Sequence, residues 1–191
     1  MSTEVTVFFI IKQDSFRTIY DNVRCMSKFS SVVKAGLCSG FWLGYSPVAS
    51  GTVGTIPAII FYLWVARNIS ESLQTVMLLL GLIMVSILTI ALGPWAESYW
   101  NKKDPSKFVL DEVAGFLFTI LFFRTPDITL TVIWAFLATR FFDIVKPPPA
   151  FQAQNAPGGW GILLDDLIAS FYAAIFLHTV NWAFPWAFGS T

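Results

Sequence analysis

The sequence predicts an all-α fold: a polytopic helical membrane protein with about five hydrophobic helices, some of them short or re-entrant. Three observations support this prediction. Apolar residues make up 55% of the 191 residues, and the mean hydropathy is +0.66. Charged residues account for only 13%, about half of their share in an average soluble domain. The 19 Phe and 8 Trp residues are typical of a bilayer, where aromatic rings lie at the interface or pack between helices.

Five hydrophobic segments follow one another along the chain. Only residues 73–92 provide the roughly 20 apolar residues that a helix needs to cross about 30 Å of hydrocarbon. The segments 56–66 and 113–123 are short, so each must recruit flanking residues, lie in a thinned membrane or fail to cross fully. The other two segments are 128–145 and 162–188. We therefore expect five helices, two of which are too short to cross unaided.

The basic residues predict the orientation of the chain in the membrane. With five crossings, ten Lys and Arg residues fall on the side of the N-terminal segment, and only Arg67 and Arg124 fall on the other side. The positive-inside rule places the richer side in the cytoplasm. We expect residues 1–33 to form a cytoplasmic N-terminal extension and residues 34–191 to form the membrane domain. The formal net charge is zero, and no nucleic-acid-binding motif occurs.

Seven of the 12 carboxylates lie in segments that border or enter hydrophobic segments on this cytoplasmic side. An acid at the centre of a span costs about 2.5–3.5 kcal/mol on insertion scales, so such acids are rare without a partner or a function. Mg²⁺ binds oxygen ligands and typically takes one or two carboxylates together with water and substrate phosphate. The pattern therefore predicts a Mg²⁺ site. Its candidate ligands are Glu97, Asp104, Asp111, Glu112, Asp143, Asp165 and Asp166.

Two other interpretations of these acids stay open. The pairs at 111–112 and 165–166 could simply mark helix N-termini, where the macrodipole favours carboxylates. That interpretation does not explain Asp143, which lies near the end of its segment. A membrane cation transporter or channel could use the same acids as an ion path. It would need acids at mid-span, whereas these acids collect at one face beside basic residues.

Three connections rich in Gly, Pro or small residues are predicted at the same face. The first, residues 36–55, runs into a helix N-terminus, and its small residues let backbone N–H groups approach an anion. In the second, three prolines after Lys146 end the preceding helix. Arg140, Asp143 and Lys146 share a face of that helix, because residues three apart are neighbours. The third, residues 157–161, leads into an acidic pair. Together the segments predict one polar site for a cation and a phosphate.

Several other phosphatase chemistries lack their residues in this sequence. There is no Cys-x5-Arg motif and no Asp-x-Asp motif. The only histidine, His178, lies deep in the last hydrophobic segment, where we expect it to be packed or hydrogen-bonded. The sequence therefore favours metal-assisted chemistry over a Cys or His nucleophile.

Five motifs stand in a characteristic order between residues 34 and 180. They are Gly-Tyr-Ser-Pro-Val-Ala-Ser-Gly-Thr-Val-Gly-Thr (44–55), Asp-Pro (104–105), Val-Leu-Asp-Glu-Val-Ala-Gly (109–115), Arg-Phe-Phe-Asp-Ile-Val-Lys-Pro (140–147) and Gly-Gly-Trp-Gly-Ile-Leu-Leu-Asp-Asp (158–166). With these motifs the chain resembles the phosphatidylglycerophosphatase A family. One departure is Ser50, where the family usually has proline. A serine there restrains the backbone of the first loop less than a proline would.

The resemblance implies a Mg²⁺-dependent lipid phosphatase in the bacterial cytoplasmic (inner) membrane. It would convert phosphatidylglycerophosphate to phosphatidylglycerol and inorganic phosphate at the cytoplasmic face. The candidate catalytic residues are Asp111, Glu112, Asp143 and Asp166. The candidates for holding the substrate phosphate are Lys146, Arg140, Ser46, Thr52 and Thr55. Metal-activated water would attack phosphorus in line, and a covalent carboxylate intermediate stays open. The phospholipid substrate is the expected partner, and the oligomeric state is left open.

Overall fold

The computed structural model describes residues 28–47 and 49–189. The chain divides after residue 37 into two units, and each is described by itself. In the first unit, residues 28–37 are helical. Residues 1–27 of the predicted N-terminal extension lie outside the described residues, so the boundary at residues 33–34 stays a prediction.

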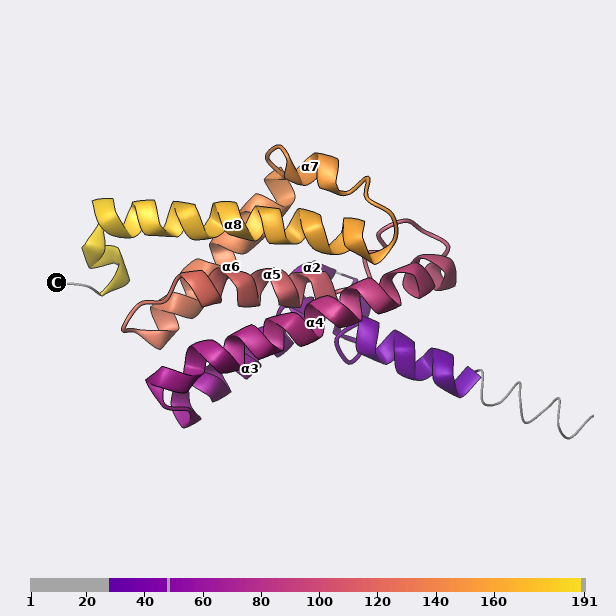
Figure 1. Cartoon of the computed structure of the whole chain (residues 1–191), viewed down its shortest axis with the longest axis horizontal. Helices are drawn as coiled ribbons and strands as arrows, with labels where there is room; N and C mark the ends of the chain where they lie inside the picture. The colour runs from indigo at the N-terminus through magenta and orange to yellow at the C-terminus, as the bar shows by residue number, and fades with distance from the viewer. Residues whose placement is uncertain (1–27, 48, 190–191) are drawn as a thin grey trace, which may run out of the picture. The chain divides into compact units, whose positions relative to one another are not determined.

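The second unit is built from helices, and its described residues contain no strand (Figure 1). The longer helices are α3 (Ile56–Asn68), α4 (Glu71–Trp100), α5 (Leu110–Phe122), α6 (Ile128–Val145) and α8 (Gly159–Ala183). The shorter ones are η1 (Leu43–Tyr45), α2 (Ser50–Gly54), α7 (Ala150–Ala153) and η2 (Pro185–Phe188). Each of the five predicted hydrophobic segments forms a helix, and the all-α prediction is confirmed for the described residues.

Three of these helices are long and apolar enough to cross a membrane. They are α4, α6 and α8, with 30, 18 and 25 residues. In contrast, α3 and α5 have 13 residues each, which corresponds to about 20 Å at 1.5 Å per residue. That length is shorter than the hydrocarbon core of about 30 Å. The predicted number of five crossings therefore stays a prediction.

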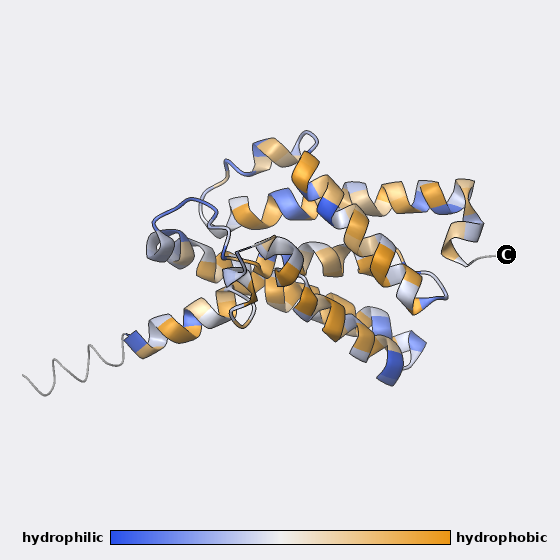
Figure 2. Cartoon of the chain, turned by 180° about the vertical axis from the view of Figure 1, so that it is seen from behind, coloured by the Kyte–Doolittle hydropathy of each residue, from blue (hydrophilic) through white to orange (hydrophobic). Residues whose placement is uncertain are grey.

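The outer faces of the long helices are apolar (Figure 2). On α4, the large side chains of Leu80, Met84 and Ile87 are all exposed, and their spacing places them on one side of the helix. An exposed apolar stripe of this kind is unfavourable in water and is expected where a helix faces lipid.

The short helix α5 is the central element of the unit. It packs against α8, α4, α6 and α3, and Phe116, Leu117 and Ile120 are fully buried. At Gly115 a Cβ would lie 2.7 Å from Ser170 Oγ of α8, so the absence of a side chain lets the two helices approach closely. In the same region Thr119 and Thr139 share a buried hydrogen bond of 2.9 Å between α5 and α6. This packing fixes the position of the acidic residues at the start of α5.

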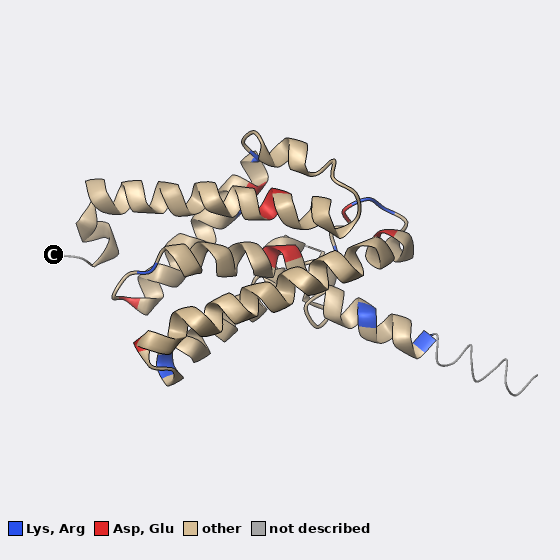
Figure 3. Cartoon of the chain, in the orientation of Figure 1, with Lys and Arg blue, Asp and Glu red and all other residues tan. Residues whose placement is uncertain are grey.

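The charged residues of the unit gather at the two ends of its helices (Figure 3). The end of α4, the start of α5, the end of α6 and the start of α8 carry the predicted acidic residues. At the opposite end, Arg124 donates a hydrogen bond to Thr75 Oγ1 (2.7 Å). His178 Nε2 lies 3.0 Å from the carbonyl oxygen of Phe122, which confirms the prediction that this histidine is hydrogen-bonded. The sequence motifs are thus brought together at one end of the helices.

Candidate functional site

A polar cavity of about 390 Å³ lies where α2, the loop after α4, and helices α5, α6 and α8 meet. We call it the acidic cavity. Its charged lining residues are Lys102, Asp104, Asp111, Glu112, Arg140, Asp143, Lys146 and Asp166. Five of these side chains are acidic and three are basic, so the lining has an excess of two formal negative charges. A cavity with this charge is complementary to a divalent cation.

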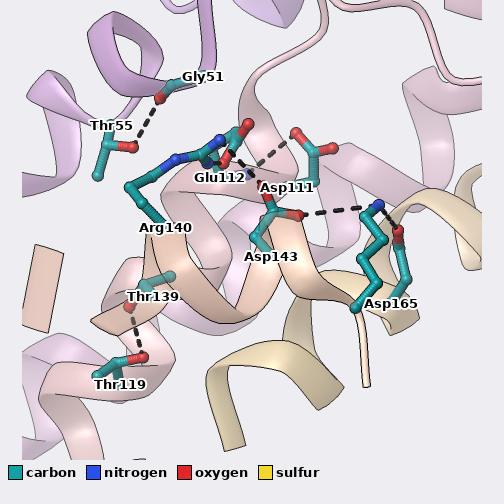
Figure 4. Close-up of polar contacts among 10 residues, drawn as sticks. Gly51, Thr55, Asp111, Glu112, Thr119, Thr139, Arg140, Asp143 and Asp165 are labelled. Atoms are coloured by element: carbon teal, nitrogen blue, oxygen red, sulfur yellow. Dashed lines mark hydrogen bonds and ion pairs between the residues drawn. The ribbon is translucent and has the colours of Figure 1, made fainter. Parts of the chain in front are cut away.

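Arg140 connects two of the helices that form the cavity (Figure 4). Its Nη1 forms an ion pair with Glu112 of α5, and its Nη2 lies 3.0 Å from Asp143 Oδ2 on its own helix. Gly51 of α2 packs directly against this pair, because a Cβ there would clash with the Glu112 carboxylate and lie 2.7 Å from Arg140 Nη2. The glycine-rich loop therefore contacts the Arg140–Glu112 pair through backbone, where a side chain would not fit.

Lys146 is the C-cap residue, at which α6 ends. Its backbone is left-handed, with φ 45°. Its Nζ lies 2.6 Å from Asp165 Oδ2 and 3.8 Å from Asp143 Oδ1. Gln154 donates a second hydrogen bond, of 2.9 Å, to the same Asp165 oxygen. Burial acts to lower the pKa of Lys146, but its hydrogen bond to Asp165 and the charge of that carboxylate outweigh burial and raise the pKa. The lysine is therefore a permanent cation at the cavity wall.

Three of the cavity acids have no basic partner among the described residues. Asp104, Asp111 and Asp166 form no ion pair there with Lys or Arg. Asp111 Oδ1 accepts a hydrogen bond from the Glu112 N–H (3.0 Å), and Asp166 lines the cavity together with Asp143. Burial, and then the charge of Asp165, raise the pKa of Asp104. Uncompensated acids in a buried site are costly unless a cation joins them.

The donor set fits Mg²⁺ by its chemistry, because it consists of carboxylate oxygens. In the described part of the chain, no three His, Cys, Asp or Glu side chains already converge closely enough to hold a metal ion. Asp165 Oδ1 is buried without a hydrogen-bond partner, so this carboxylate retains a free donor atom. The acids are thus close to one another and would have to converge further around an ion.

The structure separates the predicted site residues into those that line the acidic cavity and those that do not. Thr52 lines it, whereas the Thr55 hydroxyl is buried and donates to the Gly51 carbonyl oxygen at 2.8 Å. Ser46 and Glu97 are absent from its lining, and Glu97 lines a neighbouring cavity instead. Asp165 is also absent from the lining, and it is the ion-pair partner of Lys146, which does line the cavity.

Some residues at this site were not predicted from the sequence. Lys102 and Ser106 line the acidic cavity, and Gln154 contacts Asp165. The sequence could have indicated Lys102, because this lysine lies two residues before the Asp-Pro motif (104–105) on the predicted cytoplasmic side. Gln154 lies at the end of α7, outside every motif, and no local pattern indicated its role.

The comparison with family models decides the assignment. The model for Phosphatidylglycerophosphatase A matches residues 36–181, which include every motif described above. The chain belongs to this family. The resemblance seen in the sequence is therefore confirmed, and the chain is a phosphatidylglycerophosphatase-type enzyme, a hydrolase of phospholipid metabolism.

Curated bacterial proteins show the same relationship. The chain is 36% identical over 151 residues to a protein of Bacteroides thetaiotaomicron described as a candidate phosphatidylinositol-3-phosphatase, covering 75% of this chain and 91% of that protein. It is 28% identical over 150 residues to phosphatidylglycerophosphatase A of Escherichia coli, covering 78% and 84%. It is also 28% identical over 152 residues to the protein of that name from Haemophilus influenzae, covering 76% and 87%. No solved structure matches the chain. None of these comparisons supports the alternative of a cation transporter.

Proposed function

We propose that this protein hydrolyses the terminal phosphomonoester of phosphatidylglycerophosphate in the acidic cavity, giving phosphatidylglycerol and inorganic phosphate. The observation that carries the proposal is the acidic cavity, where five carboxylates and three basic side chains meet at one end of apolar helices. The E. coli and H. influenzae relatives with the matching name support this substrate. The differently named B. thetaiotaomicron relative makes a phosphatidylinositol phosphate the second candidate substrate.

We propose Mg²⁺ as the cofactor. Asp104, Asp111 and Asp166 are the first candidates for its ligands, because they line the cavity without a basic partner in the described part of the chain. When bound, such an ion supplies Lewis-acid stabilisation of the phosphoryl oxygens and an activated water. The two excess negative charges of the cavity lining match the charge of one Mg²⁺.

The chain's own residues would bind the phosphate and move the proton. Lys146 can neutralise a phosphate oxygen as a compact point charge, and Asp165 holds its ammonium group at the cavity wall. Both terminal nitrogens of Arg140 are engaged by carboxylates, so we assign it the role of positioning Glu112 and Asp143. Asp143 and Asp166 both line the acidic cavity. A carboxylate at this position can accept a proton from the attacking water.

The lipid tails of the substrate would lie along the apolar surface beside the cavity. Ile144 of α6 lines the cavity and is 76% exposed. Its neighbours Phe141 and Val145 are also exposed. An apolar side chain at the rim of a charged cavity suits a substrate with an anionic headgroup and two acyl chains. We propose that this rim faces the cytoplasmic leaflet of the bacterial inner membrane, as the distribution of basic residues predicts.

Phosphate release from the purified protein in mixed micelles tests the proposal. The substrates are phosphatidylglycerophosphate, phosphatidylinositol 3-phosphate and phosphatidic acid, each with and without Mg²⁺. We expect kcat/KM to be at least about tenfold higher for phosphatidylglycerophosphate than for the other two, a difference of about 1.4 kcal/mol. No release from this substrate, or a preference for the inositol lipid, would overturn the proposed substrate.

A further inference from the structure

A second polar cavity adjoins the acidic cavity. It has a volume of about 330 Å³ and shares Lys102 and Asp104 with its neighbour. We call it the lysine cavity. Its other polar lining side chains are Glu97, Lys103, Gln154 and Asn155. The two shared residues show that the cavities are adjacent, and none of the reaction steps proposed above uses the second one.

Contacts of its lining residues tie the lysine cavity to the acidic one. Glu97 Oε1 accepts a hydrogen bond from the backbone N–H of Asp104 at 3.5 Å, so this acid helps to hold the loop that carries the lysines. Gln154 donates to Asp165 Oδ2, the oxygen that also binds Lys146 of the acidic cavity. Two walls of the lysine cavity are therefore connected to groups that line the acidic cavity. Lys102 and Lys103 themselves are exposed, and the structure shows no acidic partner for either within the described residues.

Aromatic side chains surround the part of α4 that reaches this cavity. The rings of Trp95 and Tyr99 stack with centroids 4.7 Å apart, and Trp100 meets Tyr99 at 5.5 Å and Tyr45 at 6.3 Å. Trp and Tyr concentrate at the headgroup level of membranes, where one side of the ring is apolar and the other is hydrated. Glu97 lies between these residues on the same helix. The lysine cavity is therefore at a depth suited to a lipid headgroup.

We propose that the lysine cavity binds the phosphodiester of the lipid headgroup while the acidic cavity holds the phosphomonoester. This inference rests on the proposed function, because phosphatidylglycerophosphate carries both phosphates, joined by a short glycerol bridge. Such a headgroup needs a second phosphate-binding group beside the first. Lys102 and Lys103 supply cationic side chains in the lysine cavity, next to Glu97 and Asp104. A cationic side chain binds a phosphodiester oxygen through a charge-assisted hydrogen bond. Lys103 lines only the lysine cavity, so it determines specificity without contacting the reacting phosphate.

The test compares Lys103→Gln with a matched control, Lys107→Gln. Lys107 is in the same loop and is also exposed, but it lines neither cavity and instead lies over the ring of Tyr45 at 4.7 Å. We expect Lys103→Gln to raise KM for phosphatidylglycerophosphate about two- to fivefold, as for loss of one exposed charge pair. The value of kcat should change by less than about twofold, and Lys103→Arg should restore KM. The control should match the wild type.

Two inhibitors identify which phosphate the lysine binds. Phosphatidylglycerol has the diester without the monoester, so its inhibition constant should rise in Lys103→Gln by the same factor as KM. Inorganic phosphate competes for the acidic cavity, so its inhibition constant should stay unchanged. Equal changes for both inhibitors, or equal KM values in Lys103→Gln and Lys107→Gln, overturn the proposal while leaving the proposed function standing. Wild-type protein that releases no phosphate from phosphatidylglycerophosphate would instead refute the proposed function, and the inference with it.

Discussion

Lys146 Nζ lies 2.6 Å from Asp165 Oδ2, and this ion pair joins the end of α6 to the second turn of α8. The Asp165 side chain is only 3% exposed. The next residue, Asp166, lines the acidic cavity together with Asp143 of α6. The pair therefore connects helix packing to the arrangement of the proposed catalytic carboxylates, and changes to it should affect both stability and activity.

Asp165→Asn should destabilise the protein and reduce its activity. The change removes the charge that holds Lys146 and leaves a partly buried lysine without its closest partner. We expect a loss of about 1–3 kcal/mol in the free energy of unfolding, since the lysine retains some solvent access. Thermal unfolding in detergent and phosphate release measure the two effects. Asp127→Asn is the control, because Asp127 caps α6 at its other end and Asn caps equally well. Similar melting temperatures for both variants would contradict this prediction.

Asp111→Asn, Asp143→Asn and Asp166→Asn should separate metal ligands from helix caps. If these acids bind Mg²⁺ or move a proton, each change should lower kcat/KM by at least about 100-fold, or about 2.7 kcal/mol. Folding and membrane insertion should be retained, as judged by gel filtration and circular dichroism. An acid that only caps a helix tolerates Asn. Near-normal turnover in all three variants would therefore favour the capping interpretation.

Removal of divalent cations should abolish phosphate release, and Mg²⁺ should restore it. The reason is that the lining acids exceed the bases by two charges, and no cysteine is among the described residues that line the cavity. Ca²⁺ should restore little activity, because it prefers more ligands and longer bonds than Mg²⁺. The measurement is the rate of phosphate release as chelator-treated protein is titrated with Mg²⁺ or with Ca²⁺. Full activity in excess chelator would show that the carboxylates serve another purpose.

Gly51→Ala should lower activity through the Arg140–Glu112 pair. An added Cβ would clash with Glu112 and lie 2.7 Å from Arg140 Nη2, so the pair or the α2 loop must shift. We expect a loss of about 1–3 kcal/mol in stability and a fall in kcat of about tenfold or more. Pro47→Ala is the control, because Pro47 is exposed in the same loop and does not line the acidic cavity. Unchanged kcat in Gly51→Ala would show that the contact has no part in the reaction.

Single cysteines should report the orientation in the membrane. With Cys25 and Cys38 replaced, Lys107→Cys lies near the acidic cavity and Asn68→Cys lies at the end of α3, and both positions are exposed. A membrane-impermeant thiol reagent added to intact cells should label only the cysteine at position 68. In inverted vesicles it should label only the cysteine at position 107. The reverse pattern would place the proposed active site on the outer face.

Local properties of the sequence were enough to predict the helices and to indicate candidate residues for the site. Hydropathy alone located all five hydrophobic segments, because a helix that faces lipid or is buried among other helices is apolar over its own length. The prolines after Lys146 located the end of α6, because proline cannot continue a helix. The acidic motifs indicated a cation and a phosphate, because buried acids are rare without a function.

Only the tertiary structure could assign partners to these acids. Asp165 and Asp166 are adjacent in the sequence, yet Asp165 pairs with Lys146 while Asp166 lines the cavity beside Asp143. Likewise, Thr52 lines the cavity, whereas the Thr55 hydroxyl turns to a backbone oxygen. Such differences depend on the direction in which each side chain leaves its helix and on which helix packs opposite. Those contacts form between residues far apart in the chain, so composition and local spacing do not determine them.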